Sequence, residues 1–205
     1  MRLDYEVAGI SEGSFAADPF SQFEQWLQVA VEAELEEPNA MVVATVDAAG
    51  QPWSRFVLLK AVGPAGFDFY TNYESDKSNQ IATNPKASLT FGWLPLRRQV
   101  NIAGSVQPVP GPECDAYWSV RPRASQLGAW ASAQSRPLSS RQELLDRYAD
   151  IDVTYGDDVP RPPHWGGWRV VPHTIEFWQG RSNRLHDRLR YRLVGGGWEL
   201  VRLSP

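Results

Sequence analysis

The spacing of apolar residues changes once along the chain, close to Pro38. Upstream, apolar side chains recur with the helical period and predict one amphipathic helix that runs to about Glu36. Asp18 followed by Pro19 is typical of a helix start, because aspartate can cap a helix and proline fits its first position. The apolar positions of this helix are Phe20, Phe23, Leu27, Ala30 and Val31.

Downstream, β-branched and aromatic residues gather in short runs separated by turn residues, which predicts strands. We expect strands at 41–46, 55–62, 67–72, 87–93, 100–109, 168–171, 174–178, 184–194 and 198–203. Helices are expected at 112–119, 125–133 and 140–150, and another is expected to begin at Ser75. This order indicates a mainly β protein with flanking helices, an antiparallel barrel formed by one domain over residues 1–205. Residues 1–17 form an N-terminal segment whose order the sequence leaves open.

The composition limits the classes of protein. The net charge of −4 argues against general nucleic-acid binding, and the single cysteine, Cys114, allows no disulfide within the chain. We expect a cytoplasmic protein without a membrane span, because no segment has the ~18 apolar residues of one and the first residues do not resemble a signal peptide. The three histidines lack metal-ligand spacing, and neither a Gly-x-Gly-x-x-Gly nor a P-loop pattern is present.

Arginines gather in one stretch near the C-terminus, between residues 181 and 192. If 184–194 is a strand, Arg184, His186 and Arg188 share one face, since side chains alternate along a strand. Two guanidinium groups beside a histidine would bind phosphate or another oxyanion through charge-assisted hydrogen bonds. An ordinary exposed strand explains the pattern equally well at this point.

Other candidate groups are weaker when each is taken alone, and an ordinary structural role is favoured for them. Arg55 and Lys60 end an apolar run, and strict alternation puts them on opposite faces. The segment 70–77 leads into a helix start, which can bind phosphate through free backbone N–H groups. Gln99, Gln134 and Ser135 are neutral groups that could contact the edge of a ligand ring. Tyr117, Arg121 and Ser125 follow at four-residue steps and could converge at a helix–loop junction.

Taken in order and spacing, these segments resemble the pyridoxamine 5'-phosphate oxidase family over nearly the whole chain. The matching stretches are 37–41, 55–60, 69–72, 98–100, 121–130, 134–135, 165–167, 176–180 and 184–188. The resemblance implies a split-barrel fold with FMN bound at the interface of a homodimer. It also implies oxidation of pyridoxamine or pyridoxine 5'-phosphate to pyridoxal 5'-phosphate, with O2 as acceptor and H2O2 as product.

The resemblance assigns roles to residues by motif position. FMN contacts are implied for Arg55, Phe56, Val57, Leu58, Leu59, Lys60, Tyr70, Thr71, Lys77, Gln99, Gln134, Ser135, Trp178 and Arg188. Substrate contacts are implied for Arg2, Tyr5, Lys60, Tyr117, Arg121, Ser125, Arg184 and His186. Among them, Arg184 and His186 are implied to lie nearest the reacting carbon, with positioning and electrostatic roles.

One residue departs from the pattern of the family. Asp76 stands where the family usually has an arginine, directly before Lys77. A cation near the cofactor phosphate is thereby lost and a carboxylate gained. We therefore expect weaker FMN binding, in which Lys77 and Arg55 supply a larger share of the positive charge at the phosphate.

Two other functions remain open. The first is a related FMN oxidase of the same fold, such as a phenazine-biosynthesis oxidase acting on a tricyclic substrate. Tyr117, Arg121 and Ser125 argue against it, because they resemble a phosphate cage. The second is a flavin- or pyridoxal-phosphate-binding protein without turnover, which Asp76 favours to a small degree.

Overall fold

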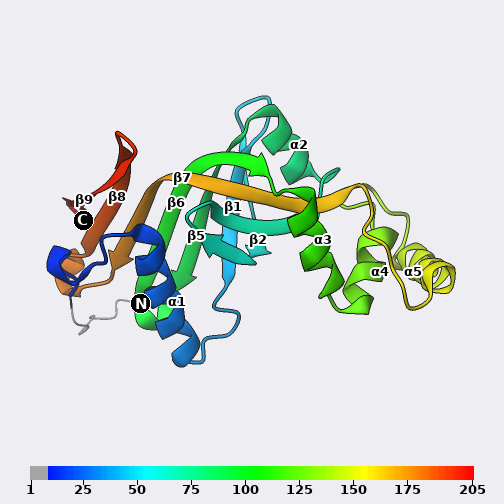
Figure 1. Ribbon diagram of the computed structural model, residues 1–205, viewed down its shortest axis with the longest axis horizontal. Coiled ribbons are helices and arrows are strands. Elements are labelled where there is room, and N and C mark those ends of the chain that lie inside the picture. The colour runs from blue at the N-terminus through cyan, green and yellow to red at the C-terminus, as the bar shows by residue number, and fades with distance from the viewer. Residues whose placement is uncertain (1–8) are drawn as a thin grey trace.

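The computed structural model describes residues 9–205, and it consists of an antiparallel sheet with helices at its faces and ends (Figure 1). Within this range nine strands pair in the order β2-β1-β5-β6-β7-β4-β3, and β8 and β9 extend the sheet from β7. The strands are β1 (Ala40–Val46), β2 (Pro52–Leu58), β3 (Ala61–Gly63), β4 (Gly66–Asn72), β5 (Lys86–Trp93), β6 (Arg98–Pro108), β7 (Trp165–Gln179), β8 (Asp187–Val194) and β9 (Gly197–Leu203). The helices are α1 (Pro19–Glu32), α2 (Asp76–Thr83), α3 (Gly111–Ser119), α4 (Arg123–Ala131) and α5 (Arg141–Tyr155).

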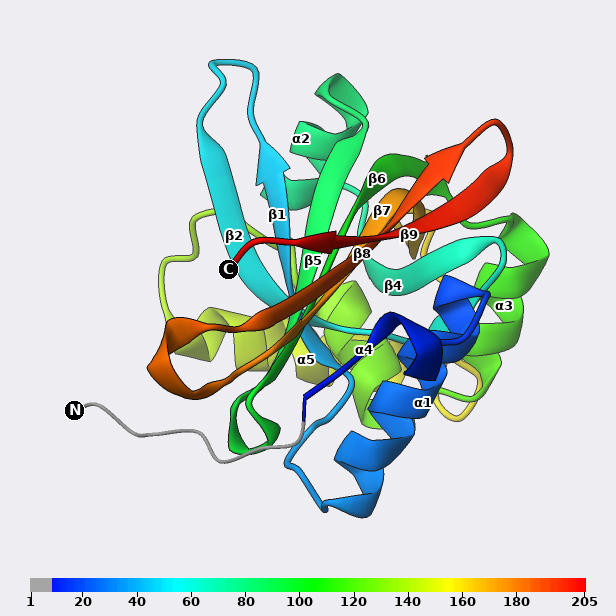
Figure 2. The ribbon, with the colours of Figure 1, turned by 90° about the vertical axis from the view of Figure 1, so that its left-hand side faces the viewer.

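The sheet curls into a half-barrel, and α1 fills the curl (Figure 2). The apolar face of α1 packs on side chains that alternate along β4 and β5. Phe23 is fully buried, and its ring lies 5.0 Å from that of Phe67 and 4.8 Å from that of Phe91. Aromatic pairs at this separation add to the stabilisation from burial alone. The helix that the apolar spacing predicted is therefore the element that closes the main core.

A second, smaller core joins α3 and α4 to the beginning of β7. Trp118 and Leu127 are buried here against Trp165, and the Trp118 indole donates a hydrogen bond to the carbonyl of Val159 (2.8 Å). This core holds the helices at one end of β7, far from β8 and β9 at the other end (Figure 1).

The fold class and most elements agree with the sequence prediction, but the predicted helix to Glu36 is too long. α1 ends at Glu32, and Glu34 adopts a left-handed backbone conformation (φ 52°). The amide of Leu35 then donates to the carbonyl of Ala30, which satisfies a free carbonyl of the last turn. Apolar spacing alone could not locate this end, since no glycine or proline marks it.

Three strand predictions are wrong in their boundaries. The run 55–62 is divided between β2 and β3, because the amide of Lys60 turns to the carbonyl of Asp68 while β2 pairs with β1. The two runs 168–171 and 174–178 form one strand, β7, with an irregularity opposite Ala103 and Gly104 that absorbs the interruption.

The strand predicted from Arg184 begins only at Asp187. Arg184 ends a short 3-10 turn, Ser182–Arg184, in which Asn183 and Arg184 have positive φ angles of 54° and 62°. Arg184 and His186 therefore do not share a strand face with Arg188, as the alternation had predicted.

No helix among residues 9–205 is long and apolar enough to cross a membrane. The same residues contain no group of three or more histidine, cysteine or acidic side chains that could hold a metal ion.

Candidate functional site

A buried ammonium group lies where β4 leads into α2. Lys77 is only 8% exposed, and its Nζ donates hydrogen bonds to Thr71 Oγ1 (3.0 Å), Ser75 Oγ (3.1 Å) and Gln134 Oε1 (2.9 Å). All three acceptors are neutral, and Lys77 forms no ion pair within residues 9–205. A buried charge without a counter-charge is costly, so this position favours the approach of an anion.

Arg55, on β2, supplies a second cation beside Lys77. Its guanidinium donates to Thr45 Oγ1 (2.6 Å) and Gln80 Oε1 (3.2 Å), which are also neutral. Burial, and after it the nearby charge of Arg55, lower the pKa of Lys77 to about 8 against the opposing effect of Asp76. Burial also lowers the pKa of Arg55, and neighbouring cations with lowered pKa values are typical of a site for a small anion.

Asp76 is turned toward an arginine that the sequence reasoning missed. Its carboxylate lies 3.6 Å from the guanidinium of Arg136, which also donates to the carbonyl of Glu74 (2.6 Å). Arg136 thus restores a positive charge at the beginning of α2 and ties the loop after α4 to it. The expected weakening of cofactor binding by Asp76 stays a prediction.

A hollow of about 370 Å³ opens next to this cation pair. The Tyr70 ring stacks on Tyr117 at 4.2 Å, and the Arg121 guanidinium lies 4.8 Å from the ring of Trp165. Arg121 donates to the carbonyl of Ser125 (3.0 Å), whereas its buried Nε has no hydrogen-bond partner in the described part of the chain. The lining includes Tyr70, Thr71, Arg121, Ser125, Gln134 and Trp165.

This hollow brings together residues that the sequence had predicted for two different ligands. Tyr70, Thr71 and Gln134 belong to the predicted FMN set, and Arg121 and Ser125 to the predicted substrate set. The sequence allowed Tyr117, Arg121 and Ser125 to converge at a helix–loop junction, although an ordinary structural role was favoured; Arg121 and Ser125 both line this hollow. Lys60 lies nearby, with its Nζ 5.8 Å from the centre of the Tyr117 ring.

A second group of predicted residues lies around the other end of β7. Gln99, Trp178 and Arg188 are direct cross-strand neighbours on β6, β7 and β8, so they share one face of the sheet. This face is opposite the core face, because the adjacent Phe177 is fully buried under α1. The His186 ring lies 4.6 Å from that of Trp178.

The arginines of β8 are not all available to a ligand. Glu176 is buried on β7 and accepts hydrogen bonds from Arg188 Nε (2.8 Å) and Arg190 Nε (2.9 Å). Burial opposes ionisation of Glu176, but these two arginines outweigh it and lower its pKa. Glu176 also escaped the sequence reasoning, although it is the direct neighbour of Arg190 across the strands.

The two groups cannot meet within one chain. Thr71 pairs with Gly166 near the first residue of β7, and Trp178 lies twelve residues further along the same strand. At roughly 3.3 Å per residue, that distance along the strand is about 40 Å. The resemblance had assigned these residues to a site at the interface of a homodimer, and within the single chain they form two separate groups, the half-sites.

The remaining predicted residues have diverse positions. Phe56 on β2 is 78% exposed, whereas Leu59 is buried in the main core, and Val57 and Leu58 are partly buried. Ser135 follows Gln134 with a positive φ of 68°. Arg2 and Tyr5 lie outside the described residues.

The curled antiparallel sheet, with a hollow beside Lys77 and Arg55, defines the class of this protein as a half-barrel with a cation-lined hollow. Family models match most of the chain: pyridoxamine 5'-phosphate oxidase over residues 27–155, and the pyridoxine 5'-phosphate oxidase C-terminal dimerisation region over residues 165–205. The chain belongs to the pyridoxamine 5'-phosphate oxidase family.

Curated relatives are similar over their whole length. A pyridoxine/pyridoxamine 5'-phosphate oxidase of Bordetella petrii is 55% identical over 100% of this chain and 98% of its own, and one of Cupriavidus necator is 52% identical over 100% and 97%.

Two solved structures are also similar to this chain. PhzG from Burkholderia lata, in complex with tetrahydrophenazine-1-carboxylic acid, has a TM-score of 0.91 at 31% identity and covers 98% of both chains. A pyridoxamine 5'-phosphate oxidase-related, FMN binding protein of Nostoc punctiforme has a TM-score of 0.76 at 17% identity over 93% of this chain and 100% of its own, and it supports the fold alone. The split-barrel fold that the resemblance implied is therefore confirmed.

The buried position of Lys77 predicts pH-dependent anion binding by the cofactor-free protein. Lys77 is charged below its pKa of about 8 and neutral above it, so affinity for sulfate, whose charge is constant in this range, is expected to fall between pH 7 and 9. A bound anion favours the charged form and moves the midpoint upward. Lys77→Met should bind sulfate more weakly and remove most of the pH dependence, as measured by calorimetric titration. A wild-type affinity that is constant from pH 7 to 9 would contradict the role of Lys77.

Proposed function

We propose that this protein is an FMN-dependent oxidase that converts pyridoxamine or pyridoxine 5'-phosphate to pyridoxal 5'-phosphate, with O2 as acceptor and H2O2 as product. The observation that carries the proposal is the pair of cations formed by the buried Lys77 and the partly buried Arg55, whose hydrogen-bond acceptors are neutral, beside a hollow lined in part by aromatic rings. Such a pair fits a phosphate, and both FMN and the substrate carry one. Production of pyridoxal phosphate would place the enzyme in vitamin B6 salvage.

The residues around Lys77 fit the phosphate end of FMN. Lys77 and Arg55 would neutralise its charge, while Thr71 and Gln134 would orient it through hydrogen bonds. FMN, when bound, supplies the acceptor for the two electrons of the oxidation. The protein's contribution is to hold cofactor and substrate in a fixed relation and to keep water away.

The hollow beside it fits the substrate phosphate. Arg121 has a buried Nε without a partner in the described chain, and the Ser125 side chain lines the same hollow. Tyr70 lines the hollow and stacks on Tyr117 behind it, so its ring gives the hollow a flat wall next to which a pyridine ring could lie. Arg184 and His186 would lie nearest the reacting carbon and stabilise charge that develops there.

A homodimer would bring the two half-sites together. The half-sites lie at opposite ends of β7, so the Trp178–His186 group of one subunit must meet the Lys77 group of another if both contact one ligand. The C-terminal dimerisation region matched over 165–205 includes Trp178, His186 and Arg188 of the second half-site. An apolar groove beside the exposed Phe56 and Leu94, on the sheet face away from α1, offers surface for a second copy.

The main alternative is a phenazine-type oxidase, because PhzG has nearly the same fold. The higher identity to pyridoxine/pyridoxamine 5'-phosphate oxidases favours the B6 substrates, as does the charged hollow at Arg121. A carrier or sensor that binds FMN without turnover has the same cation pair, so only a reaction separates it from the oxidase.

The proposed function is tested by the absorbance of the FMN-loaded protein during anaerobic addition of pyridoxine 5'-phosphate. The flavin band should bleach and then recover in air, with release of pyridoxal phosphate and H2O2. A flavin band that the substrate leaves unchanged would refute the oxidase and favour the carrier. Bleaching by a reduced phenazine precursor alone would favour the PhzG-like activity.

Arg184 should affect turnover more than cofactor binding. We expect Arg184→Gln to lower kcat by about a hundredfold, the usual effect of losing one group that stabilises developing charge, with unchanged FMN content. Steady-state kinetics and the flavin-to-protein absorbance ratio measure the two quantities. Arg192→Gln on the same hairpin, where Arg192 forms an exposed ion pair with Glu199, is the matched control. Equal losses of turnover and FMN in Arg184→Gln would contradict this division of roles.

The divided site predicts complementation between two inactive subunits. Lys77→Met removes a group of the first half-site, and Arg184→Gln removes one of the second. A heterodimer that carries one change in each chain has one site with both defects and one intact site, so its turnover should be about half that of the wild type. Differently tagged chains, co-expressed and purified through both tags, allow the measurement. A heterodimer no more active than either homodimer would show that both residues of a site come from one chain.

A further inference from the structure

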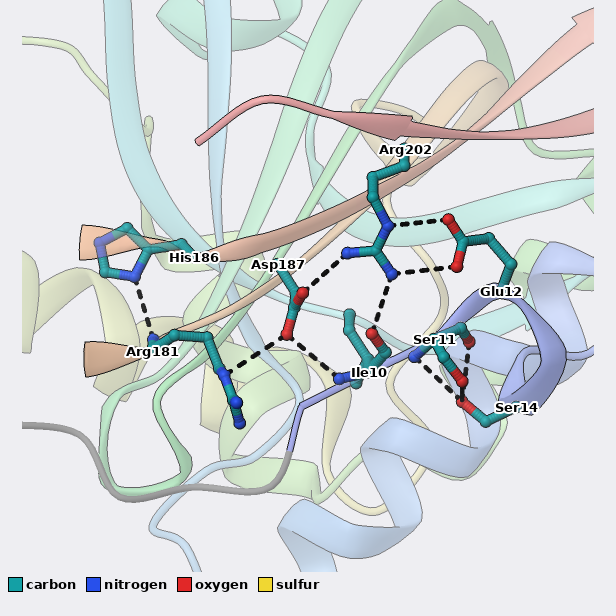
Figure 3. Close-up of polar contacts among 8 residues, drawn as sticks. All are labelled: Ile10, Ser11, Glu12, Ser14, Arg181, His186, Asp187 and Arg202. Atoms are coloured by element: carbon teal, nitrogen blue, oxygen red, sulfur yellow. Dashed lines mark hydrogen bonds and ion pairs between the residues drawn. The ribbon is translucent and has the colours of Figure 1, made fainter. Parts of the chain in front are cut away.

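A carboxylate directly after His186 joins three separate parts of the chain. Asp187, the first residue of β8, accepts hydrogen bonds from the amide of Ile10 (3.3 Å) and from Arg202 Nη1 (2.7 Å) (Figure 3). Its Oδ2 also lies 3.7 Å from Arg181 Nε. The side chain of Asp187 is mostly buried, so its charge acts on these groups with little screening.

Arg202, on β9, holds the same N-terminal segment from a second direction. Its guanidinium donates to both carboxylate oxygens of Glu12 (2.7 and 3.0 Å) and to the carbonyl of Ile10 (3.0 Å) (Figure 3). Hydrogen bonds from Arg202 lower the pKa of Glu12 to about 2, so this pair remains charged at any ordinary pH. Residues 10–12 are thus fixed to the β8–β9 hairpin by paired, charge-assisted hydrogen bonds.

The backbone at Gly9 passes close to the side chains of Asp187 and Arg181. A Cβ atom at residue 9 would lie 3.0 Å from Asp187 Oδ2 and 3.2 Å from Arg181 Cζ. Only a residue without a side chain lets the chain pass this close to the Asp187–Arg181 pair without a shift of one of them.

Arg181 links Asp187 to His186, because it contacts both residues. The amide of Arg181 donates to His186 Nδ1 (3.0 Å), so Nδ1 is the acceptor and a neutral His186 has its proton on Nε2 (Figure 3). The Arg181 side chain is at the same time paired with Asp187. The loop between β7 and β8 is therefore closed on itself by one backbone contact and one ion pair.

We propose that Asp187 is a positioning residue: through Arg181 and Arg202 it fixes the loop that carries Arg184 and His186, and it seats residues 9–12 against that loop. The inference rests on the proposed function for its effect on catalysis, but the seating itself is independent of any reaction. Its consequence is that substrate affinity depends on a carboxylate that does not touch the substrate. The orientation and tautomer of His186 depend on the same carboxylate.

The test compares Asp187→Asn with Glu199→Gln in the FMN-loaded enzyme. Asn keeps the shape of Asp187 but loses the charge, and Glu199→Gln removes an exposed ion pair from the same hairpin. We expect Asp187→Asn to raise the KM for pyridoxine 5'-phosphate about tenfold, with a much smaller change of kcat and unchanged FMN affinity. Glu199→Gln should leave all three as in the wild type. Equal effects of the two variants, or a loss confined to FMN affinity, would overturn the proposal.

Two further measurements do not depend on turnover. Hydrogen exchange of the Ile10 amide should accelerate in Asp187→Asn and in Arg202→Gln, but not in Glu199→Gln. The ¹⁵N shifts of the three histidines, with His186 assigned from His186→Asn, should give the Nε2–H form in the wild type and a tautomer mixture in Asp187→Asn. Unchanged exchange and an unchanged tautomer would overturn the proposal. If Asp187→Asn does not fold, Glu12→Gln gives the exchange readout. A wild type without oxidase activity would refute the proposed function. The exchange rate of the Ile10 amide and the tautomer of His186 would still test whether Asp187 holds residues 9–12 and the His186 loop in place.

Discussion

The pairing of β7 determines where everything else in the molecule lies. One edge of this strand pairs with β6 along its length, while the other edge pairs first with β4 and then with β8. The irregularity opposite Ala103 and Gly104 lies between these two halves and lets one continuous strand serve both. A Cβ at Gly104 would lie 2.1 Å from the carbonyl of Val171, so the close backbone approach there requires glycine. Because β4 leads into α2 and β8 follows the His186 loop, the length of β7 alone keeps the two half-sites apart.

The cations of the two half-sites differ in their partners: neutral oxygens at the first half-site and a carboxylate at the second. At the first, Lys77 and Arg55 are held by neutral oxygens, and the low pKa of Lys77 records the cost of burying its charge. At the second, Glu176 neutralises Arg188 and Arg190 within the sheet. A buried cation lacking a counter-charge is unfavourable until an anion arrives, whereas a paired one is already satisfied. At the first half-site the charge of Lys77 is thus held by neutral groups alone, whereas at the second Arg188 is already oriented by Glu176.

The sequence predicted what depends on local pattern and failed where distant contacts decide. The helix after Asp18, the helix at Ser75 and most strands follow from spacing, capping and turn residues. The early end of α1, the division at Lys60 and the late start of β8 depend on backbone hydrogen bonds to remote residues or on positive φ angles, which no spacing reveals. The arginine stretch illustrates the same limit: alternation predicted a shared face for Arg184 and Arg188, but the turn at Asn183 removes Arg184 from the strand. Arg136 and Glu176 were missed because their importance comes from partners distant in the sequence.

The fold by itself does not select the substrate, since it is shared with PhzG, which is solved in complex with tetrahydrophenazine-1-carboxylic acid, and with a distant FMN binding protein. What distinguishes this chain must lie in side chains that reach the ligand, and in those that hold such side chains in place. The hollow at Arg121 belongs to the first kind, because an unpartnered Nε beside Ser125 favours a charged, hydrogen-bonding group over an apolar ring. Asp187 belongs to the second kind, because it joins the His186 loop, the last strand and residues 9–12. The main core contacts both ends, through Phe69 on β4 and Tyr191 on β8, and each end has additional support of its own. The helices α3 and α4 supply it for the hollow, and the ion-pair network around Asp187 supplies it for His186.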